Sequence, residues 1–346
     1  MPVNRSDRIF LCHASEDGSQ VEMIHRKLKA ARLNPWIDKK DLPPARDWDA
    51  EIGKMLSAAR LILIFVSRHL ISKNGYVQRE IEIALDILRQ MPADSTFIIP
   101  VRLDDCSIPE SLNRLTHFDL FEGTDFNTLA EHIKTVLALY TDLRDGQIYK
   151  TILVGTQTWL AENLNYAVAD SWWYDDDPVN GRRYGRLYSW EAAAQRACPD
   201  GWHVPTDSEW KELASNAGGY RDMDEGEPHV GMRIGRPQAA FHSLIVGGES
   251  GFDAFLGGYR NSAGEFTKFS NMGLYWTATE YQYSDLGNFE PLYPREIKSA
   301  WIYYFYLLAG APELRRDYQF PVRPDVYPKA CGLSVRCVRN KREGER

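Results

Sequence analysis

The carboxylate of Glu80 is the side chain of this sequence best placed to do chemistry. Residues 76–88 follow an Asn-Gly turn and have the apolar spacing of an amphipathic helix. At about 100° per residue, Glu80 falls within the apolar arc, whereas Glu82 falls on the polar side. Functional carboxylates often face a low-dielectric interior, although such a glutamate can equally pair with an arginine or cap a neighbouring turn. The apolar arc comprises Tyr76, Val77, Ile83, Ala84, Ile87 and Leu88.

Length and charge describe a globular chain of two domains. Its 346 residues exceed the usual size of one domain, and 44% hydrophobic content supplies two cores. A net charge of −7 argues against nucleic acid or an anionic membrane as partners. No apolar run approaches the roughly 20 residues of a membrane-spanning helix, and no signal-peptide pattern opens the sequence. We therefore expect a cytoplasmic location.

The cysteines and the missing motifs narrow the chemistry further. Five scattered cysteines fit a reducing compartment better than a disulfide framework. The sequence has no CxxC, HExxH, GxxxxGKS/T or GxGxxG pattern. We expect neither a metal site nor a resident cofactor.

Short apolar runs and helical patterns alternate through the first 140 residues. This alternation predicts a doubly wound α/β domain with a parallel sheet, because the run at 61–67 is apolar without alternation. Such folds bind ligands beyond the carboxyl ends of their strands. That rim holds residues 12–17, 38–47 and Ser67 onward. The predicted strands are 8–12, 35–38, 61–67, 97–101 and 117–120; the predicted helices are a first one containing Val21 and Leu28, then 49–59, 76–88 and 127–140.

In the order of their predicted elements and in their local sequence motifs, residues 6–140 resemble the bacterial form of the TIR domain family. The similarity is carried by Phe10-Leu11-Cys12-His13-Ala14-Ser15-Glu16-Asp17, by Trp36-Ile37-Asp38 with its Leu-Pro-Pro loop, by Phe65-Val66-Ser67, and by Tyr76-Val77-Gln78-Arg79-Glu80-Ile81. In the last segment, enzymatic members carry an aromatic residue four positions before their glutamate. The resemblance implies a flavodoxin-like fold and cleavage of NAD⁺ between nicotinamide and ribose.

Glu80 is the catalytic residue that this resemblance implies. A sheltered carboxylate stabilises the oxocarbenium-like ribose or orients its hydroxyls, as carboxylates do in glycoside hydrolysis. The candidate substrate-binding residues are Ser15, Trp36, Asp38, Arg46, Ser67 and Tyr76. Trp36 can also be core and Arg46 a solvated charge. Cys12 fits packing better than a nucleophilic role, since no histidine partner is evident.

The composition changes after a predicted linker at residues 141–146. Long apolar runs stop, and Trp, Tyr and Gly become frequent. Residues 147–340 are expected to form an α+β domain with long loops, followed by a charged tail at 341–346. Its predicted elements are a hairpin at 147–159, helices at 189–197 and 208–216, and short strands at 257–260, 273–277, 300–304 and 333–338.

Residues 145–340 resemble the Fibrobacter succinogenes major paralogous domain family, which is related to C-type lectin-like and formylglycine-generating-enzyme-like folds. The similarity is carried by Trp159-Leu160-Ala161-Glu162-Asn163-Leu164-Asn165-Tyr166, Tyr184-Gly185-Arg186-Leu187-Tyr188-Ser189-Trp190, residues 198–206 and 255–260, and Ser334-Val335-Arg336-Cys337-Val338. In that fold Cys198 and Cys337 lie close together. Secreted relatives can bridge them, whereas in a cytoplasmic chain we expect thiols.

Known chemistries of the related folds do not transfer to this half. Cys331 and Cys337 lack the spacing of the formylglycine-generating cysteine pair. Glu290-Pro291-Leu292 is not a calcium-dependent sugar-binding motif. We expect His203 to be a packed, hydrogen-bonded histidine rather than a ligand.

A tyrosine-rich stretch from 281 to 327 is the candidate binding surface of the second domain. Tyr, Ser, Asn and Asp are typical of adaptable binding surfaces, and lectin-like folds of this kind display segments diversified by diversity-generating retroelements. These aromatics can equally pack a strand-poor domain, as Trp276 and Trp301 are expected to do. The candidate ligand-binding residues are Tyr281, Tyr283, Asp285, Asn288, Tyr303 and Tyr304.

Together the two halves predict a sensor joined to an effector. We expect the lectin-like half to recognise a protein surface as its ligand and the TIR half to degrade NAD⁺ on self-association, in a setting such as prokaryotic antiphage defence. The alternative is a non-enzymatic TIR adaptor with the same recognition domain. A third hypothesis gives the second half its own substrate-modifying activity.

Overall fold

The computed structural model describes residues 8–37, 56, 58–72, 76–91, 96–121, 126–223, 231–281, 299–307, 312–317 and 328–340. The chain divides into two compact units, Met1–Leu139 and Tyr140–Arg346. The division falls at the end of the predicted TIR region.

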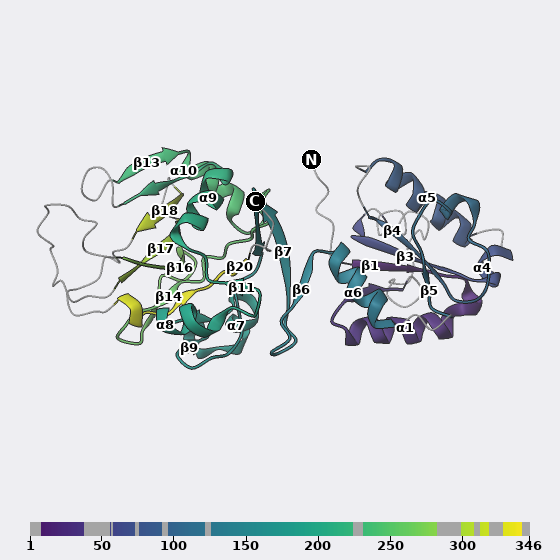
Figure 1. The fold of residues 1–346 in the computed structure, drawn as a ribbon, viewed down its shortest axis with the longest axis horizontal. Coiled ribbons are helices and arrows are strands. Elements are labelled where there is room, and N and C mark those ends of the chain that lie inside the picture. Colours follow the sequence, from purple (N-terminus) through teal and green to yellow (C-terminus); the bar gives the residue numbers. More distant parts are fainter. Residues whose placement is uncertain are drawn as a thin grey trace, which may run out of the picture. The chain divides into compact units, whose positions relative to one another are not determined.

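A five-stranded parallel sheet forms the centre of the first unit (Figure 1). Its strands are β1 (Arg8–Cys12), β2 (Asn34–Trp36), β3 (Leu61–Val66), β4 (Ile98–Arg102) and β5 (Phe118–Asp119), in the order β2-β1-β3-β4-β5. Every residue of β3 is buried, because both faces of the sheet are covered. The predicted doubly wound α/β fold is confirmed.

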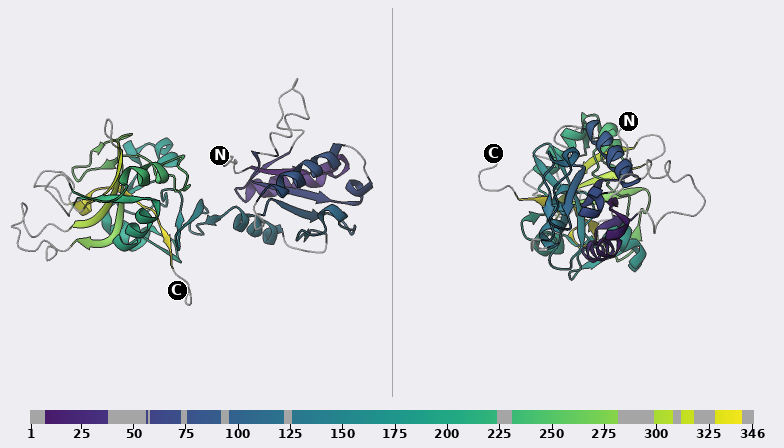
Figure 2. Two further views of the ribbon diagram at one scale, coloured as in Figure 1. Left: turned by 90° about the horizontal axis from the view of Figure 1, so that it is seen from above. Right: turned by 90° about the vertical axis from the view of Figure 1, so that its right-hand side faces the viewer.

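Helices cover the two faces of this sheet (Figure 1, Figure 2). The face that carries Phe10 and Cys12 packs against α5 (Tyr76–Arg89), and the face that carries Ile9 and Leu11 packs against α1 (Gly18–Ala30) and α6 (Phe126–Val136). Two further turns are a 3₁₀ helix at Ser15–Asp17 and a second one at Glu110–Leu112.

Two details of the first unit differ from the predictions. The short helix α4 (Arg68–Ser72) follows β3 and was not anticipated. The closing helix α6 ends at Val136 rather than residue 140, because Leu139–Thr141 forms strand β6. Of the helix predicted at 49–59, only residues 56, 58 and 59 are described, and residues 56 and 58 are helical.

The predicted linker at 141–146 is an ordered turn of the second unit. Asp142 is fully buried, and the Arg144 guanidinium forms an ion pair with it at 2.7 Å. The same guanidinium donates hydrogen bonds to the carbonyls of Arg196, Ala197 and Cys198 and stacks on the Tyr166 ring at 3.8 Å. Residues near the start of the unit are thereby fixed to its interior.

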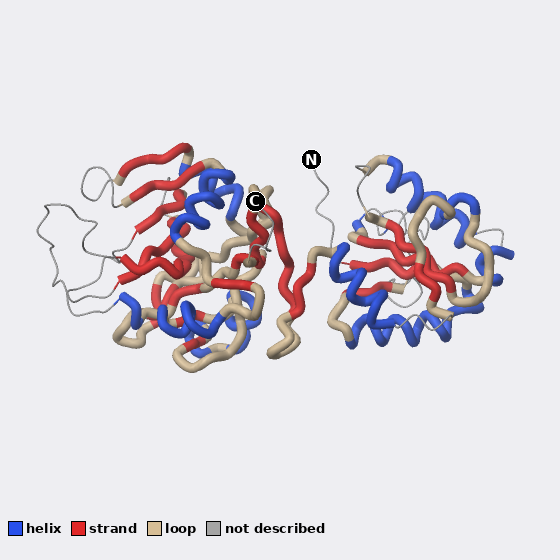
Figure 3. Tube along the Cα trace, viewed as in Figure 1, coloured by secondary structure: helices blue, strands red, loops and turns tan. Residues whose placement is uncertain are grey.

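The second unit is rich in β-strands (Figure 3). One sheet has the order β13-β12-β18-β17-β16-β19-β10-β9, a second has the order β11-β20-β8-β7-β6, and β14 pairs with β15. The strands after β6 are β7 (Ile148–Val154), β8 (Gln157–Leu160), β9 (Ser171–Trp172), β10 (Leu187–Tyr188), β11 (Trp202–His203), β12 (Gly219–Asp222), β13 (Met232–Gly235), β14 (Tyr259–Arg260), β15 (Phe266–Thr267), β16 (Met272–Tyr281), β17 (Ser299–Tyr306), β18 (Glu313–Asp317), β19 (Leu333–Ser334) and β20 (Val338–Arg339).

Short helices connect these strands, and their termini follow local sequence signals. Thr206 caps α9 (Asp207–Ala217) in a capping box with Glu209. Helix α8 (Trp190–Ala192) continues into a π-helix at Ala193–Ala197. The remaining helices are α7 (Pro178–Tyr184), α10 (Pro237–Leu244) and 3₁₀ turns at Tyr174–Asp176 and Pro328–Ala330.

Aromatic side chains make up much of the core of the second unit. Trp159, Trp210 and Trp276 are almost fully buried, and Trp301 is only 6% exposed. The predicted packing role of Trp276 and Trp301 is confirmed. Among the described residues, none of the helices has the length and apolar character needed to cross a bilayer.

Cys198 and Cys337 are joined by a disulfide. Their Cα atoms lie 5.9 Å apart, which is within the usual range for a disulfide. The expectation that both are thiols was inferred from the assumed compartment and is wrong. Cys12, Cys106 and Cys331 are buried thiols.

Candidate functional site

Glu80 lies on the buried face of α5. Helical periodicity aligns Val77, Glu80, Ile81 and Ala84 toward the sheet, and each is at most 7% exposed. Glu80 itself is 4% exposed, whereas Glu82 belongs to the exposed residues of the helix. The predicted placement of this carboxylate within an apolar helix face is confirmed.

Cys12 brings the end of β1 into contact with Glu80. The Cys12 thiol donates a hydrogen bond to Glu80 Oε2 at 3.1 Å, across 68 positions of sequence. Strand β1 pairs with β2 on one side and β3 on the other, so its last residue sits on a rigid element. The carboxylate is therefore held at the carboxyl end of the parallel sheet, where folds of this class bind ligands.

Ser67 and Asp17 form a second buried polar contact at the carboxyl ends of the strands. The Ser67 hydroxyl donates to Asp17 Oδ2 at 2.5 Å and accepts a hydrogen bond from the Leu70 backbone N–H at 3.1 Å. Ser67 thus caps α4 and connects β3 to the segment after β1. Asp17 precedes α1 at its N-cap position but makes no side-chain cap there, since its carboxylate accepts the hydrogen bond from Ser67.

The other candidate substrate-binding residues have different surroundings. Ser15 is exposed and donates to Glu16 Oε2 at 3.1 Å. Trp36 is 7% exposed and packs on the Phe10 ring at 5.0 Å, so it occupies the core position that the sequence left open as the alternative. Tyr76 begins α5, but its side chain lies outside the described residues, as do Asp38 and Arg46.

Tyr303 and Tyr304 correct the predicted ligand surface of the second unit. Both belong to β17, which lies between β16 and β18 in the sheet, and they are 0% and 8% exposed. Successive side chains of a strand point to opposite faces, and both faces are covered here: Tyr303 packs with Trp210, and Tyr304 packs with Ile302 and Trp276. Neither tyrosine presents its ring to solvent, so the assignment as ligand-binding residues is wrong.

The remaining predicted ligand-binding residues cannot be placed. Tyr281 ends β16, but its side chain lies outside the described residues. Tyr283, Asp285, Asn288 and the segment Glu290-Pro291-Leu292 also lie outside them.

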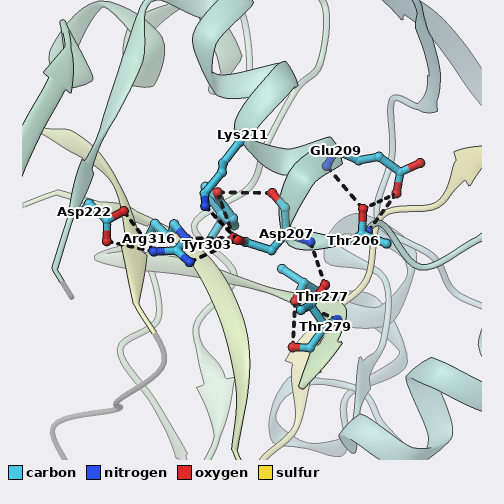
Figure 4. Close-up of polar contacts among 9 residues, drawn as sticks. All are labelled: Thr206, Asp207, Glu209, Lys211, Asp222, Thr277, Thr279, Tyr303 and Arg316. Atoms are coloured by element: carbon cyan, nitrogen blue, oxygen red, sulfur yellow. Dashed lines mark hydrogen bonds and ion pairs between the residues drawn. The ribbon is translucent and has the colours of Figure 1, made fainter. Parts of the chain in front are cut away.

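A network of buried charged side chains contacts the Tyr303 hydroxyl in the second unit (Figure 4). The Arg316 guanidinium, 4% exposed, donates to both carboxylate oxygens of Asp207 at 2.7 and 3.0 Å and to both of Asp222 at 2.9 Å. It also stacks on the Trp301 ring at 3.3 Å. Lys211 and the Tyr303 hydroxyl contact Asp207 at 3.1 and 3.2 Å. Each charge in the network is matched, which is typical of a structural element.

Burial and ion pairing have opposing effects on the Asp207 carboxyl. Burial is the largest single effect and raises its pKa, but the hydrogen bonds and positive charges of Arg316 and Lys211 together hold the pKa below the ordinary value of 3.8. Asp207 therefore stays ionised at neutral pH and keeps the network charged.

His203 and Cys331 are structural by their contacts. His203 Nε2 lies 2.9 Å from Glu209 Oε1, and Nδ1 lies 2.6 Å from Asn340 Oδ1, which confirms a hydrogen-bonded histidine. The hydrogen bond to Glu209 raises the pKa of His203. Burial raises the pKa of the Cys331 thiol to about 11, and Cys337 is in the disulfide, so neither has the properties of a reactive thiolate. Among the described residues, no three His, Cys, Asp or Glu side chains are grouped so that they could hold a metal ion.

Sequence reasoning missed the residues whose partners are distant along the chain. Arg316 lies 109 positions from Asp207, and no local pattern marks that pair. Arg336 is fully buried and donates to Asn163 and to the carbonyls of Leu160, Phe252 and Asp253. An arginine between Val335 and Cys337 in an apolar stretch was a signal for this burial.

The parallel sheet with helices on both faces defines a doubly wound α/β domain, and a β-rich domain follows it. Residues 9–134 match the family model of the TIR domain, and residues 152–339 match that of the Fibrobacter succinogenes major domain. The second match covers more than half of the chain. The chain belongs to the Fibrobacter succinogenes major domain family, and a TIR domain precedes this region.

Solved structures with TIR domains are similar to the first unit. They include the TIR domain of the Toll-related receptor TRR-2 from Hydra magnipapillata, at 20% identity and a TM-score of 0.31, covering 36% of this chain and 97% of that one. The activated Roq1 resistosome, which recognises the pathogen effector XopQ, matches at 17% identity and a TM-score of 0.26, covering 38% and 71%.

A third similar structure is a metazoan TIR-STING receptor from C. gigas in complex with 2',3'-cGAMP. It matches at 15% identity and a TM-score of 0.32, covering 38% of this chain and 42% of that receptor, so the chain spans less than half of the receptor's length. A comparison with curated proteins found no match.

Proposed function

We propose that the TIR domain cleaves NAD⁺ at the bond between nicotinamide and ribose, with Glu80 as the catalytic carboxylate. The observation that carries the proposal is the burial of Glu80 on the apolar face of α5, where Cys12 holds it at the carboxyl end of the sheet. A glutamate kept for solubility would occupy the exposed position of Glu82.

The reaction needs little more than a sheltered negative charge. Breaking the bond from ribose C1′ to the ring nitrogen releases neutral nicotinamide and leaves positive charge on the ribose. A carboxylate stabilises that charge or orients the ribose hydroxyls, and water then supplies the hydroxyl group at C1′ and releases a proton. The second product is then linear ADP-ribose. If the adenine of the same molecule attacks C1′ in place of water, the second product is cyclic ADP-ribose.

Self-association is part of the proposal. Because Glu80 is only 4% exposed, a substrate reaches it only after a local rearrangement, and contacts between neighbouring TIR domains would supply one. Asp38, Arg46, Tyr76 and Ser15 remain proposed substrate contacts. Ser67 and Trp36 act through the packing of the site rather than through open contact surfaces.

The second unit is proposed to be the lectin-like sensor. In this proposal it recognises a protein ligand, and its binding clusters the TIR domains in the cytoplasm of a prokaryote that responds to phage. Family membership and the ordered β-rich framework support a recognition role. The proposal needs no metal, no resident cofactor and no nucleic-acid or membrane partner.

Nicotinamide release tests the proposal. The full chain is incubated with NAD⁺, alone and clustered through a multivalent tag, beside Glu80→Ala and the exposed control Glu82→Ala. We expect release that requires clustering, is lost in Glu80→Ala and persists in Glu82→Ala. Equal release by the wild type and Glu80→Ala would reject the assignment of Glu80.

A non-enzymatic adaptor is the second candidate, favoured by the packing of Trp36. A tryptophan that contacts Phe10 in the core has no open face for nicotinamide or adenine. No release by the clustered wild type, together with retained self-association, would favour the adaptor.

A further inference from the structure

We propose that Cys12 is a positioning residue for Glu80: its thiol fixes the carboxylate in the orientation that the reaction uses. This inference rests on the proposed cleavage of NAD⁺ and adds a named residue to that site. The observation behind it is the hydrogen bond from Cys12 Sγ to Glu80 Oε2 at 3.1 Å.

The two partners differ in how firmly their elements hold them. Cys12 ends β1, whose backbone pairs on both sides, with Cys12 opposite Ile64 of β3. Glu80 carries a longer side chain with three rotatable bonds before its carboxylate and reaches the sheet from α5. The strand therefore fixes the position of the thiol, and the hydrogen bond from the thiol restricts the orientation of the carboxylate.

The chemistry of the thiol suits this role. An S–H group is a weak, uncharged donor, so it orients an oxygen atom and leaves the negative charge of the carboxylate intact. A lysine or arginine at the same place would neutralise the charge that stabilises the ribose cation. Both side chains are buried, at 2% for Cys12 and 4% for Glu80, so water does not compete for the contact.

Three variants separate positioning from packing in the clustered full chain. Cys12→Val removes the donor and keeps the bulk, Cys12→Ser keeps a donor, and Cys106→Ala trims a buried cysteine in the same apolar cluster. We expect kcat to fall about 10-fold in Cys12→Val with little change in KM. Cys12→Ser should stay within about 3-fold of the wild type because its hydroxyl donates, and Cys106→Ala should match the wild type. Circular dichroism checks that each variant is folded.

The outcomes distinguish this inference from the proposed function. Wild-type turnover in Cys12→Val, or equal losses in Cys12→Ser and Cys12→Val, would overturn positioning and leave NAD⁺ cleavage standing. An inactive clustered wild type would overturn both.

Infrared spectroscopy provides a readout that needs neither activity nor a stable Cys12→Val protein. The S–H stretching band of Cys12 is assigned by its loss in Cys12→Ser. In Glu80→Leu this band should move to higher wavenumber because the acceptor is gone, while Glu82→Leu should leave it in place. A band that does not respond to Glu80→Leu would show that the thiol does not hold the carboxylate, and the inference would fail.

Discussion

Glu80 of the TIR domain and Asp207 of the second unit are carboxylates of similar burial that accept hydrogen bonds from different kinds of donor. They are 4% and 8% exposed, and each belongs to a helix packed on a sheet. Asp207 accepts two hydrogen bonds from the Arg316 guanidinium and is also contacted by Lys211 and Tyr303. Glu80 accepts a hydrogen bond from a thiol.

The difference shows that burial alone does not indicate what a carboxylate does. Asp207 lies at the first position of α9, where the helix dipole favours a negative charge, and its ion pair joins α9 to β18. Its charge holds the architecture together. Glu80 accepts a hydrogen bond from the uncharged Cys12 thiol, and it lies where the fold class places ligands.

Removing Arg316 should have the largest effect. Arg316→Met removes the guanidinium that pairs with the buried carboxylates of both Asp207 and Asp222, and we expect a loss of about 3–5 kcal/mol of unfolding free energy. Denaturant unfolding of the full chain, followed by tryptophan fluorescence, measures it. Arg315→Met on the same strand, which breaks a 3.4 Å pair with Glu313, should cost about 1 kcal/mol or less. Equal losses in the two variants would contradict a structural role for the network.

Glu80→Gln should lower turnover strongly while it changes stability little. We expect clustered turnover to fall by about 10²–10³-fold, because the variant keeps the shape of the side chain but loses the charge. The thermal midpoint should stay near that of the wild type, with Glu82→Gln as the control for both measurements. A large loss of stability with turnover retained would place Glu80 in the same class as Asp207.

Asp207→Asn should lower the unfolding free energy by about 2 kcal/mol, because charge-assisted hydrogen bonds become neutral ones. This loss is smaller than the one expected for Arg316→Met. Since the folded pKa of Asp207 lies below 3.8, its stabilisation is complete above that pH and is lost as the pH falls through the folded value. The difference in unfolding free energy between the wild type and Asp207→Asn should therefore become smaller as the pH falls below 3.8. A gap that stays constant to the lowest pH would argue against the ion pair.

The smallest expected effect belongs to His203. The hydrogen bond to Glu209 raises its pKa from the ordinary 6.5, although burial opposes this, so its stabilisation is complete below 6.5 and is lost as the pH rises through the folded value. Thermal midpoints measured between about pH 5 and 8 should decline more in the wild type than in His203→Gln. Parallel profiles would show that the Glu209 contact contributes nothing.

Local periodicity predicted the features that depend on neighbouring residues. The apolar run at 61–67 indicated a strand covered on both faces, and the spacing around Glu80 predicted its burial. Val77, Ile81 and Ala84 define the buried face of α5. The predicted apolar arc is therefore rotated by a fraction of a turn relative to the face that is buried.

The errors concern features that depend on tertiary partners. Composition marked Tyr303 and Tyr304 as binding residues, but a central strand buries both of its faces. For Trp36 the sequence left stacking on substrate and core packing both open, and its tertiary contact with Phe10 is what places it in the core. The Arg316 ion pairs join residues 109 and 94 positions apart, which no single-sequence pattern reveals.

The disulfide between Cys198 and Cys337 also governs how the second unit responds to proteolysis. The cross-link closes a loop of 139 positions. A protease that cuts the chain once at any point between these two cysteines would leave two fragments covalently joined. Such a nicked chain would keep its full mass on a non-reducing gel and separate into two bands only after reduction, so the fragment beyond the cut would stay attached to the TIR domain.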